Sequence, residues 1–278
     1  MGVIYGIAAA MLYGSGDYLG GRASSGVDVR RVLLIAQCTA AVASLVCVLV
    51  VSGHAIGRDL AYGAAAGVGT AVGLGLLYRA LAIGSAGVVA PLTAVVGAIV
   101  PVTWGVAIGE RPSALAGAGV VVAVFAAALI AREPDDSDAP RAGVAMALGA
   151  GFALGSGFVC YAATSDGSGL WPLVSARAVA IALIAGALIL SRGNPSPGPL
   201  TVRQRWLAVG AGAFDVGGTV SLVAGVRSDL AVLVAAITAL APGFTVGWSW
   251  LFLHDRVSRV QTVGIVLALI GLAAIAAG

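Results

Sequence analysis

The chain of 278 residues has a formal net charge of +3, is 60% hydrophobic and is only 10% charged. A soluble globular domain carries roughly 25% charged residues, so this composition excludes an ordinary soluble fold and predicts a surface that faces lipid. All fifteen basic residues are arginines scattered through short loops, a pattern that excludes a nucleic-acid-binding surface. We therefore expect a multi-pass integral membrane protein whose environment is the lipid bilayer.

Ten apolar segments follow one another along the chain, each close to the length of about 20 residues that a membrane helix needs. They span residues 3–19, 32–51, 60–83, 86–108, 114–131, 143–164, 170–190, 206–226, 230–253 and 260–277. The chain begins with Met1-Gly2-Val3-Ile4, which lacks the basic region of a signal peptide, so we interpret the first segment as a membrane helix. The connections are too short for a soluble domain, and any functional site must lie within the membrane or at its faces.

The two halves of the chain repeat each other at separations of 140 to 145 residues. The matching positions are Gly14-Ser15-Gly16 with Gly155-Ser156-Gly157, Gln37 with Arg177, Thr93 with Thr238, and Glu110 with Asp255. We predict two repeats of five helices each, over residues 1–132 and 141–278. Because five is odd, the two repeats must cross the membrane in opposite directions, which is the inverted-repeat architecture of many secondary transporters.

The last two helices of each half resemble the EamA domain of the drug/metabolite transporters. Leu240-Ala241-Pro242, an apolar helix and then His254-Asp255-Arg256 are similar to that family's proline, helix and Gly-Glu-Arg turn. Gly109-Glu110-Arg111 matches the turn in the first half, although Gly97 stands where the proline would fall. Arg177 is similar to an arginine often seen in the second helix of each repeat, and Gln37 departs from it. The resemblance implies ten helices, a central cavity and alternating access.

Three charged residues fall inside the predicted membrane segments: Asp17, Arg177 and Asp215. A charge at the bilayer centre costs at least about 2.5–3.5 kcal/mol on insertion scales, which makes each a functional candidate. Arg177 and Asp215 lie on adjacent segments. They either lock two helices as an ion pair or line a polar cavity in which Arg177 meets an anionic substrate group, and both interpretations stay open.

Asp17 is the candidate proton-coupling residue. Partly apolar surroundings favour the protonated form of a carboxyl group, which would let Asp17 exchange protons during transport. The alternative is that Asp17 reaches the membrane interface, where it caps a helix or pairs with Arg22.

Prolines and aromatic residues complete the predicted substrate-binding set. Pro101 and Pro242 each remove a backbone donor in matching segments, and broken helices in matching positions point to the site of an inverted-repeat transporter. The candidate substrate-binding residues are Arg177, Asp215, Gln37, Trp104, Trp248, Tyr78, Pro101 and Pro242. The structural alternatives are packing kinks for the prolines and membrane-interface anchoring for the aromatic residues.

The sequence favours a secondary transporter that exports a small metabolite, amino-acid-like or amphipathic, from the cytoplasm of a bacterium across the cell membrane, with protons as the candidate coupling ion. A channel-like or purely structural membrane protein is the alternative. We expect no enzyme activity, cofactor or metal, because the chain has no lysine for a Schiff base or phosphate-binding loop and both histidines, His54 and His254, lie in loops without metal-ligand spacing.

The sequence leaves the oligomeric state and the orientation in the membrane open. The protein is expected to be a monomer or a homodimer. The loop arginines favour cytoplasmic odd-numbered loops and therefore external termini, whereas the family resemblance implies termini on the inside.

Overall fold

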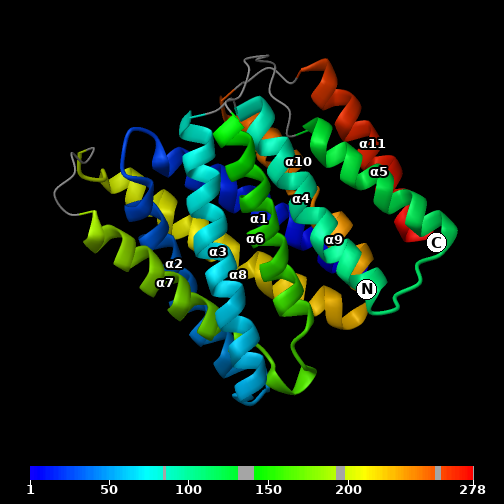
Figure 1. Ribbon diagram of the computed structural model, residues 1–278, viewed down its shortest axis with the longest axis horizontal. Helices are drawn as coiled ribbons and strands as arrows, with labels where there is room; N and C mark the ends of the chain where they lie inside the picture. The colour runs from blue at the N-terminus through cyan, green and yellow to red at the C-terminus, as the bar shows by residue number, and fades with distance from the viewer. Residues whose placement is uncertain (84–85, 131–140, 192–197, 254–257, 278) are drawn as a thin grey trace.

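The computed structural model describes residues 1–83, 86–130, 141–191, 198–253 and 258–277, and within them every regular element is helical. The helices are α1 (Gly2–Ser24), α2 (Val29–Val50), α3 (Gly57–Ile83), α4 (Ala86–Ala107), α5 (Ala114–Ile130), α6 (Arg141–Ala162), α7 (Trp171–Leu190), α8 (Val202–Ser228), α9 (Ala231–Thr238), α10 (Ala241–Leu253) and α11 (Arg259–Ala277), with a short 3₁₀ turn, η1 (Asp166–Ser168), before α7. The predicted all-helical class is confirmed. In Figure 1, α2 and α7 lie side by side at one edge of the bundle, and α5 and α11 lie side by side at the other.

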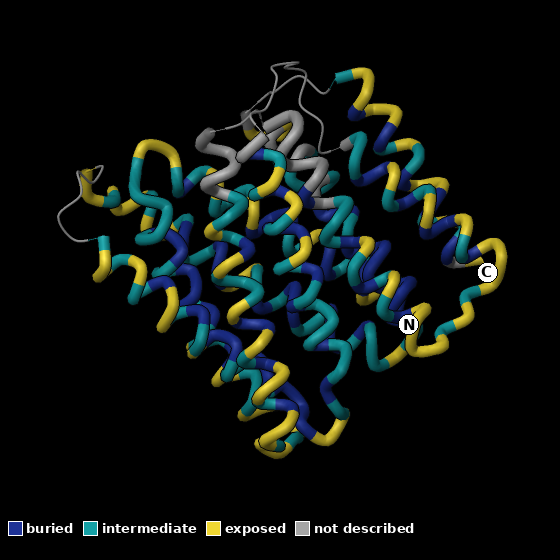
Figure 2. The backbone as a smooth tube through the Cα atoms, viewed as in Figure 1, coloured by how far each residue is buried: buried dark blue, intermediate teal, exposed yellow. Residues whose placement is uncertain are grey.

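Six stretches of the described residues are long and apolar enough to cross a membrane. They are Val29–Val50, Gly57–Leu77, Gly143–Ala162, Trp171–Leu190, Val202–Ser228 and Ala231–Phe252, and three shorter apolar helices accompany them. Large apolar side chains such as Leu49, Phe125 and Leu269 are exposed on the outer helices, whereas the buried positions follow the inward sides of the bundle (Figure 2). An apolar surface of this extent needs lipid around it.

Helix starts are set by local capping. Asp28 accepts a hydrogen bond from the backbone N–H of Arg30 at the start of α2, and Thr201 forms a capping box with Gln204 at the start of α8. Partial burial raises the pKa of Asp28, but hydrogen bonds from the Arg30 side chain and backbone outweigh it and hold that pKa below its usual value. These caps fix where two neighbouring helices enter the bundle.

The ninth predicted segment is broken in two. α9 ends at Thr238 and α10 begins at Ala241, because Pro242 has no N–H to donate to the carbonyl of Thr238, four residues earlier. By contrast, α4 continues across both Pro91 and Pro101. The expected pair of matching helix breaks is therefore present in only one half.

The packing of one half repeats that of the other. α1 packs mainly against α8, and α6 packs mainly against α3. In the same way, α2 contacts α7 and α8, while α7 contacts α2 and α3. Each repeat thus supplies its first two helices to the third helix of the opposite repeat.

Two glycines bring helices of opposite repeats into backbone contact. A Cβ on Gly67 of α3 would fall 2.9 Å from the Cα of Ala176 in α7, and one on Gly212 of α8 would fall 3.0 Å from the Cα of Ala36 in α2. Gly212 follows Gly67 by 145 residues, and Ala176 follows Ala36 by 140. These contacts hold the next residues along the chain, Gln37 and Arg177, at the centre of the molecule.

Candidate functional site

Arg177 and Asp215 form an ion pair in the middle of the bundle. Arg177 Nη1 lies 2.7 Å from Asp215 Oδ2, and the Arg177 side chain is 3% exposed against 30% for Asp215. Because Asp215 Oδ2 is itself buried, the exposed surface of Asp215 belongs to the rest of its side chain, which includes Oδ1. The predicted pairing is present, with the cation buried behind the carboxylate.

Two neutral side chains, Gln37 of α2 and Thr219 of α8, also bind the guanidinium group of Arg177. Arg177 Nη1 donates to Gln37 Oε1 at 3.1 Å, and Nη2 donates to Thr219 Oγ1 at 3.0 Å. Tyr13 of α1 also donates to Thr219 Oγ1, at 3.0 Å, and that hydroxyl donates in turn to the carbonyl of Asp215. The Thr219 hydroxyl therefore uses both lone pairs and its hydrogen, and it joins α1, α7 and α8.

Three buried polar atoms at this cluster lack a hydrogen-bond partner: Arg177 Nε, the hydroxyl of Tyr161 in α6, and Asp215 Oδ2, which instead forms the ion pair with Arg177. Tyr161 is buried and interacts electrostatically with both Arg177 and Asp215. A buried polar group without a partner costs about 1–3 kcal/mol. The Tyr161 hydroxyl is thus a free donor and acceptor beside the ion pair.

Asp17 of α1 lies close enough to Asp215 of this cluster to interact with it electrostatically. It is one turn from Tyr13 and two turns from Ala10, which is buried, and its neighbour Gly16 packs against Phe214 and the backbone of Asp215. The Asp17 side chain is exposed although protein atoms surround it, and it repels Asp215 electrostatically. Asp17 is therefore recessed within the protein but keeps accessible surface.

The predicted aromatic and proline residues occupy other places. Trp248 Nε1 donates to Ser15 Oγ at the contact of α1 with α10, where its ring stacks on Phe252. Pro101 is fully buried, and the carbonyl of Gly97, which it leaves without a helical donor, faces Gly155 of α6. Both residues hold helices together at these contacts.

The remaining predicted residues add little to the cluster. Trp104 is partly buried in α4. The side chains of Tyr78 and Pro242 lie outside the described part of the chain.

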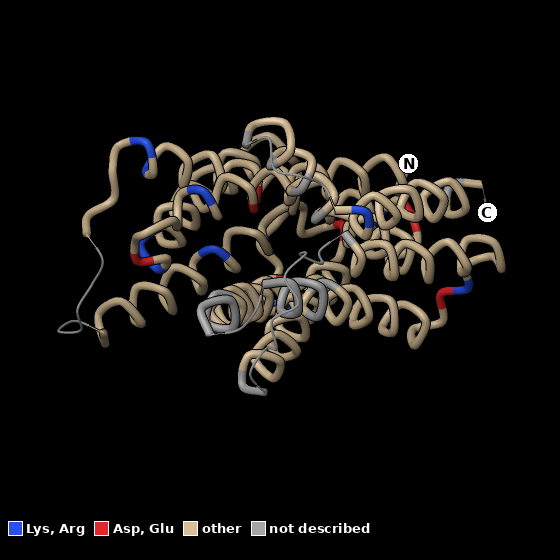
Figure 3. Tube along the Cα trace, turned by 90° about the horizontal axis from the view of Figure 1, so that it is seen from above, with Lys and Arg blue, Asp and Glu red and all other residues tan. Residues whose placement is uncertain are grey.

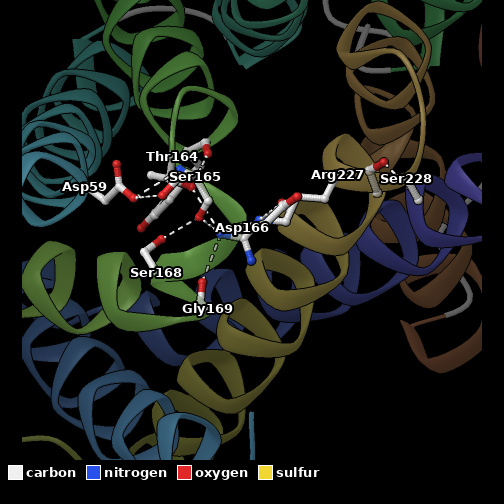
Figure 4. A network of polar contacts seen from close by, with 10 residues as sticks. Asp59, Thr164, Ser165, Asp166, Ser168, Gly169, Arg227 and Ser228 are labelled. Carbon is white, nitrogen blue, oxygen red and sulfur yellow. Dashed lines mark hydrogen bonds and ion pairs between the residues drawn. The ribbon is translucent and has the colours of Figure 1, made fainter. Parts of the chain in front are cut away.

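A second polar network closes one end of the molecule (Figure 4). The buried carboxylate of Asp59, at the start of α3, accepts hydrogen bonds from the backbone N–H and the hydroxyl of Ser165. Arg227, near the end of α8, donates to the carbonyls of Ser165 and Gly169 and pairs with Asp166 at 3.3 Å. We call this the end-B network. It ties α3 and α8 to the loop between α6 and α7.

The opposite end, end A, has a weaker counterpart. Gln204 at the start of α8 donates to the carbonyl of Ser25, in the loop between α1 and α2. Gln204 follows Asp59 by 145 residues, and Ser165 follows Ser25 by 140. The same two positions of the repeat therefore meet at both ends, through a buried carboxylate at end B and through a neutral, exposed contact at end A. Charged residues otherwise gather near helix ends (Figure 3).

Glu110 has a structural role at end B. Its two carboxylate oxygens accept hydrogen bonds from the backbone N–H groups of Ala231 and Val232, the first residues of α9. The preceding Gly109 has a φ of 99°, a left-handed conformation that favours glycine. Within the Gly-Glu-Arg turn, Glu110 thus caps the start of α9, a helix of the other repeat. The matching Asp255 lies outside the described residues.

Comparison with known proteins agrees with this geometry. The EamA-like transporter family matches the chain twice, over residues 1–132 and 141–277. The chain belongs to the EamA-like transporter family.

Comparison with solved structures supports the fold of this EamA-like transporter and gives no information about its substrate. One of 27 matching chains of solved structures, described only as the crystal structure of a protein, has a TM-score of 0.77 at 16% identity and covers 98% of this chain and 95% of its own. That identity supports the fold alone. No curated protein matches the sequence.

Membership of the EamA-like transporter family fixes the type of protein: a two-repeat membrane transporter of the drug/metabolite type. Within the described residues no group of three potential metal ligands comes together. The sequence had not singled out Tyr13, Tyr161 or Thr219, or the network of Asp59 with Arg227. Thr219 stands one helical turn after Asp215, which is the one signal that could have identified it.

Proposed function

We propose that this chain is a secondary transporter whose substrate site is the polar cluster around Arg177 and Asp215, and that it works by alternating access. The observation that carries the proposal is the contact of Arg177 with Gln37. These residues occupy the same position of the two repeats, so they meet where the repeats adjoin. A site at that junction is exposed to opposite ends when the repeats tilt relative to each other.

The proposed architecture is ten membrane helices in two inverted repeats, with α9 and α10 forming one broken helix. The end-A and end-B contacts support it, because the same pair of repeat positions recurs at opposite ends of the molecule. The proposed location is the bacterial cytoplasmic membrane, with export of a small metabolite by a monomer or homodimer.

The conformation described here supports access from end A. Along the inward side of α1, Gly6 and Ala10 are buried, whereas Asp17, nearer end A, is exposed. Toward end B, the cluster is covered by tightly packed apolar side chains, including Leu173, Val223 and Val234. The apolar layer and the end-B network together separate the site from end B.

We expect removal of Arg227 to loosen end B. Arg227→Met deletes the charged donor to the carbonyls of Ser165 and Gly169 while keeping much of the side-chain volume. In a background without native cysteines, labelling of Ser168→Cys, a buried position of the same loop, by a membrane-impermeant maleimide should become about tenfold faster. The control Arg111→Met removes an exposed arginine that donates to the neighbouring carbonyl of Glu110, and it should leave the rate unchanged. Equal labelling in both variants would contradict a closing role for Arg227.

Counterflow in liposomes tests the proposed function. Candidate solutes come from a metabolite and toxic-compound resistance screen of bacteria that express the chain. A carrier loaded with unlabelled solute should accumulate labelled solute transiently, with saturation and trans-stimulation. Flux that rises linearly with concentration and shows no trans-stimulation would indicate a channel, and a structural protein would show no flux.

A further inference from the structure

The groups that this site presents to an entering solute are carboxylates. Asp17 is exposed, and Asp215 is exposed to 30% at the side that faces away from Arg177. Both carboxylates lie toward end A, the accessible side, whereas the guanidinium lies behind Asp215. An entering solute therefore meets two carboxylates before it reaches any cation among the described residues of the cluster.

Arg177 presents almost no surface to an entering solute. Nη1 serves Asp215 and Gln37, Nη2 serves Thr219, and the residue is 2% exposed. Its unpartnered Nε is buried as well. A carboxylate on the solute would need a free arginine fork, and it would instead face Asp17 and Asp215.

The charges of the cluster cancel only while Asp17 carries a proton. With Asp17 and Asp215 ionised and Arg177 protonated, the described residues of the site carry one uncompensated negative charge. An unpaired charge within a membrane protein is costly, and a single positive charge on the solute would neutralise it.

One polar group on the end-B side of the ion pair also lacks a partner among the described residues. The Tyr161 hydroxyl is buried, interacts electrostatically with the ion pair and has no hydrogen-bond partner. A polar group on another part of the solute, reaching past the ion pair, would satisfy that oxygen. Tyr161 belongs to α6, so a ligand that reaches it would contact both repeats.

We propose that the site binds a small organic monocation, a protonated amine without a carboxylate, whose ammonium group lies between Asp17 and Asp215 Oδ1. This inference rests on the proposed function and narrows its substrate class. It replaces the expected contact of Arg177 with an anionic substrate group: Arg177 instead holds Asp215 in place as its counter-charge.

Three probes that share a phenylethyl group test the proposal. 2-Phenylethylamine is a cation, phenylalanine adds a carboxylate to it, and 3-phenylpropionate carries the carboxylate alone. Binding is measured by calorimetry on the purified full chain in detergent at neutral pH. We expect saturable binding of the amine at millimolar concentrations or below, and at least tenfold weaker binding of the other two probes.

Variants of Asp17 locate the binding. Asp17→Asn, which keeps the shape and removes the charge, should weaken amine binding about tenfold or more, and Asp17→Glu should restore most of it. Asp229→Asn, a substitution near the end of α8 toward end B, is the matched control and should bind the amine like the wild type. Gel-filtration profiles and thermal unfolding confirm that each variant is folded.

The possible failures are distinguishable. Absence of amine binding, equal binding of phenylalanine or 3-phenylpropionate, or amine binding unaffected by Asp17→Asn would each overturn the cation site. If the counterflow assay still shows trans-stimulated flux of some other solute, the proposed transporter function stands without it. Absence of carrier flux for every solute would refute the proposed function instead.

Discussion

Replacing Arg177 with leucine should abolish transport and lower the free energy of unfolding by about 3 kcal/mol. Removing one partner of a buried ion pair leaves the other charge uncompensated, at a cost of about 3–5 kcal/mol. We expect the lower end of this range, because Asp215 is partly exposed and can be hydrated. Thermal unfolding in detergent measures the stability, and counterflow in liposomes measures the transport.

The double variant Arg177→Leu with Asp215→Leu separates the two effects. It leaves neither charge of this pair behind, and replacing a whole buried pair with apolar side chains is often close to neutral for stability. We expect its unfolding temperature to return most of the way to that of the wild type, while transport stays absent. If transport returned together with stability, the pair would serve only to lock α7 to α8, and the proposed site would be wrong.

A methyl group at either of two glycines should be as damaging as the loss of the ion pair. In Gly67→Ala and Gly212→Ala the new Cβ meets backbone atoms of Ala176 and Ala36, which cannot rotate away. Overpacking of this kind costs about 1–3 kcal/mol even when side chains can adjust. We expect about 3 kcal/mol here, together with lost counterflow, because the helices that carry Gln37 and Arg177 must move apart.

The matched control is Gly186→Ala. Gly186 is also a helix-interior glycine, in α7, and an added Cβ there has nothing within 4 Å. Alanine is the better helix former by about 0.8–1.0 kcal/mol, so this variant should be equally or more stable. If Gly67→Ala and Gly212→Ala did not unfold at lower temperatures than Gly186→Ala, the close-packing role of Gly67 and Gly212 would be refuted.

The sequence predicts an all-helical membrane protein of two repeats, because membrane helices appear as long apolar segments and repeats appear as matching residues at a nearly constant separation. The constant separation of Gln37 and Arg177 anticipates that they occupy equivalent places, and the charges of Arg177 and Asp215 anticipate their pairing. Their role in substrate binding stays a prediction, as does that of Asp17. The sequence does not reveal that only one of the two proline-containing segments breaks. α4 stays continuous across Pro101 where it packs against α6, and that packing leaves no local signal in the sequence.

The rest of the site depends on contacts between distant helices. Tyr13 and Thr219 stand 206 residues apart, and nothing in the chain marks a tyrosine and a threonine as partners. The end-B network uses ordinary loop residues, Ser165 and Asp166, which are typical of turns anywhere. Whether a carboxylate such as Asp17 is exposed or buried is decided by the neighbouring helices and not by its own segment.

The contact between Gln37 and Arg177 bears on the ancestry of the chain. If either half assembled with a second copy of itself, the central position would meet its own duplicate, giving two arginines or two glutamines face to face. Two arginines face to face repel each other and lose the amide acceptor that Gln37 supplies, and two glutamines face to face lack the guanidinium donor. Fusion of two diverged copies avoids both outcomes. Residues 1–132 and 141–278, expressed as separate polypeptides, should therefore associate as unlike partners and not as pairs of like halves.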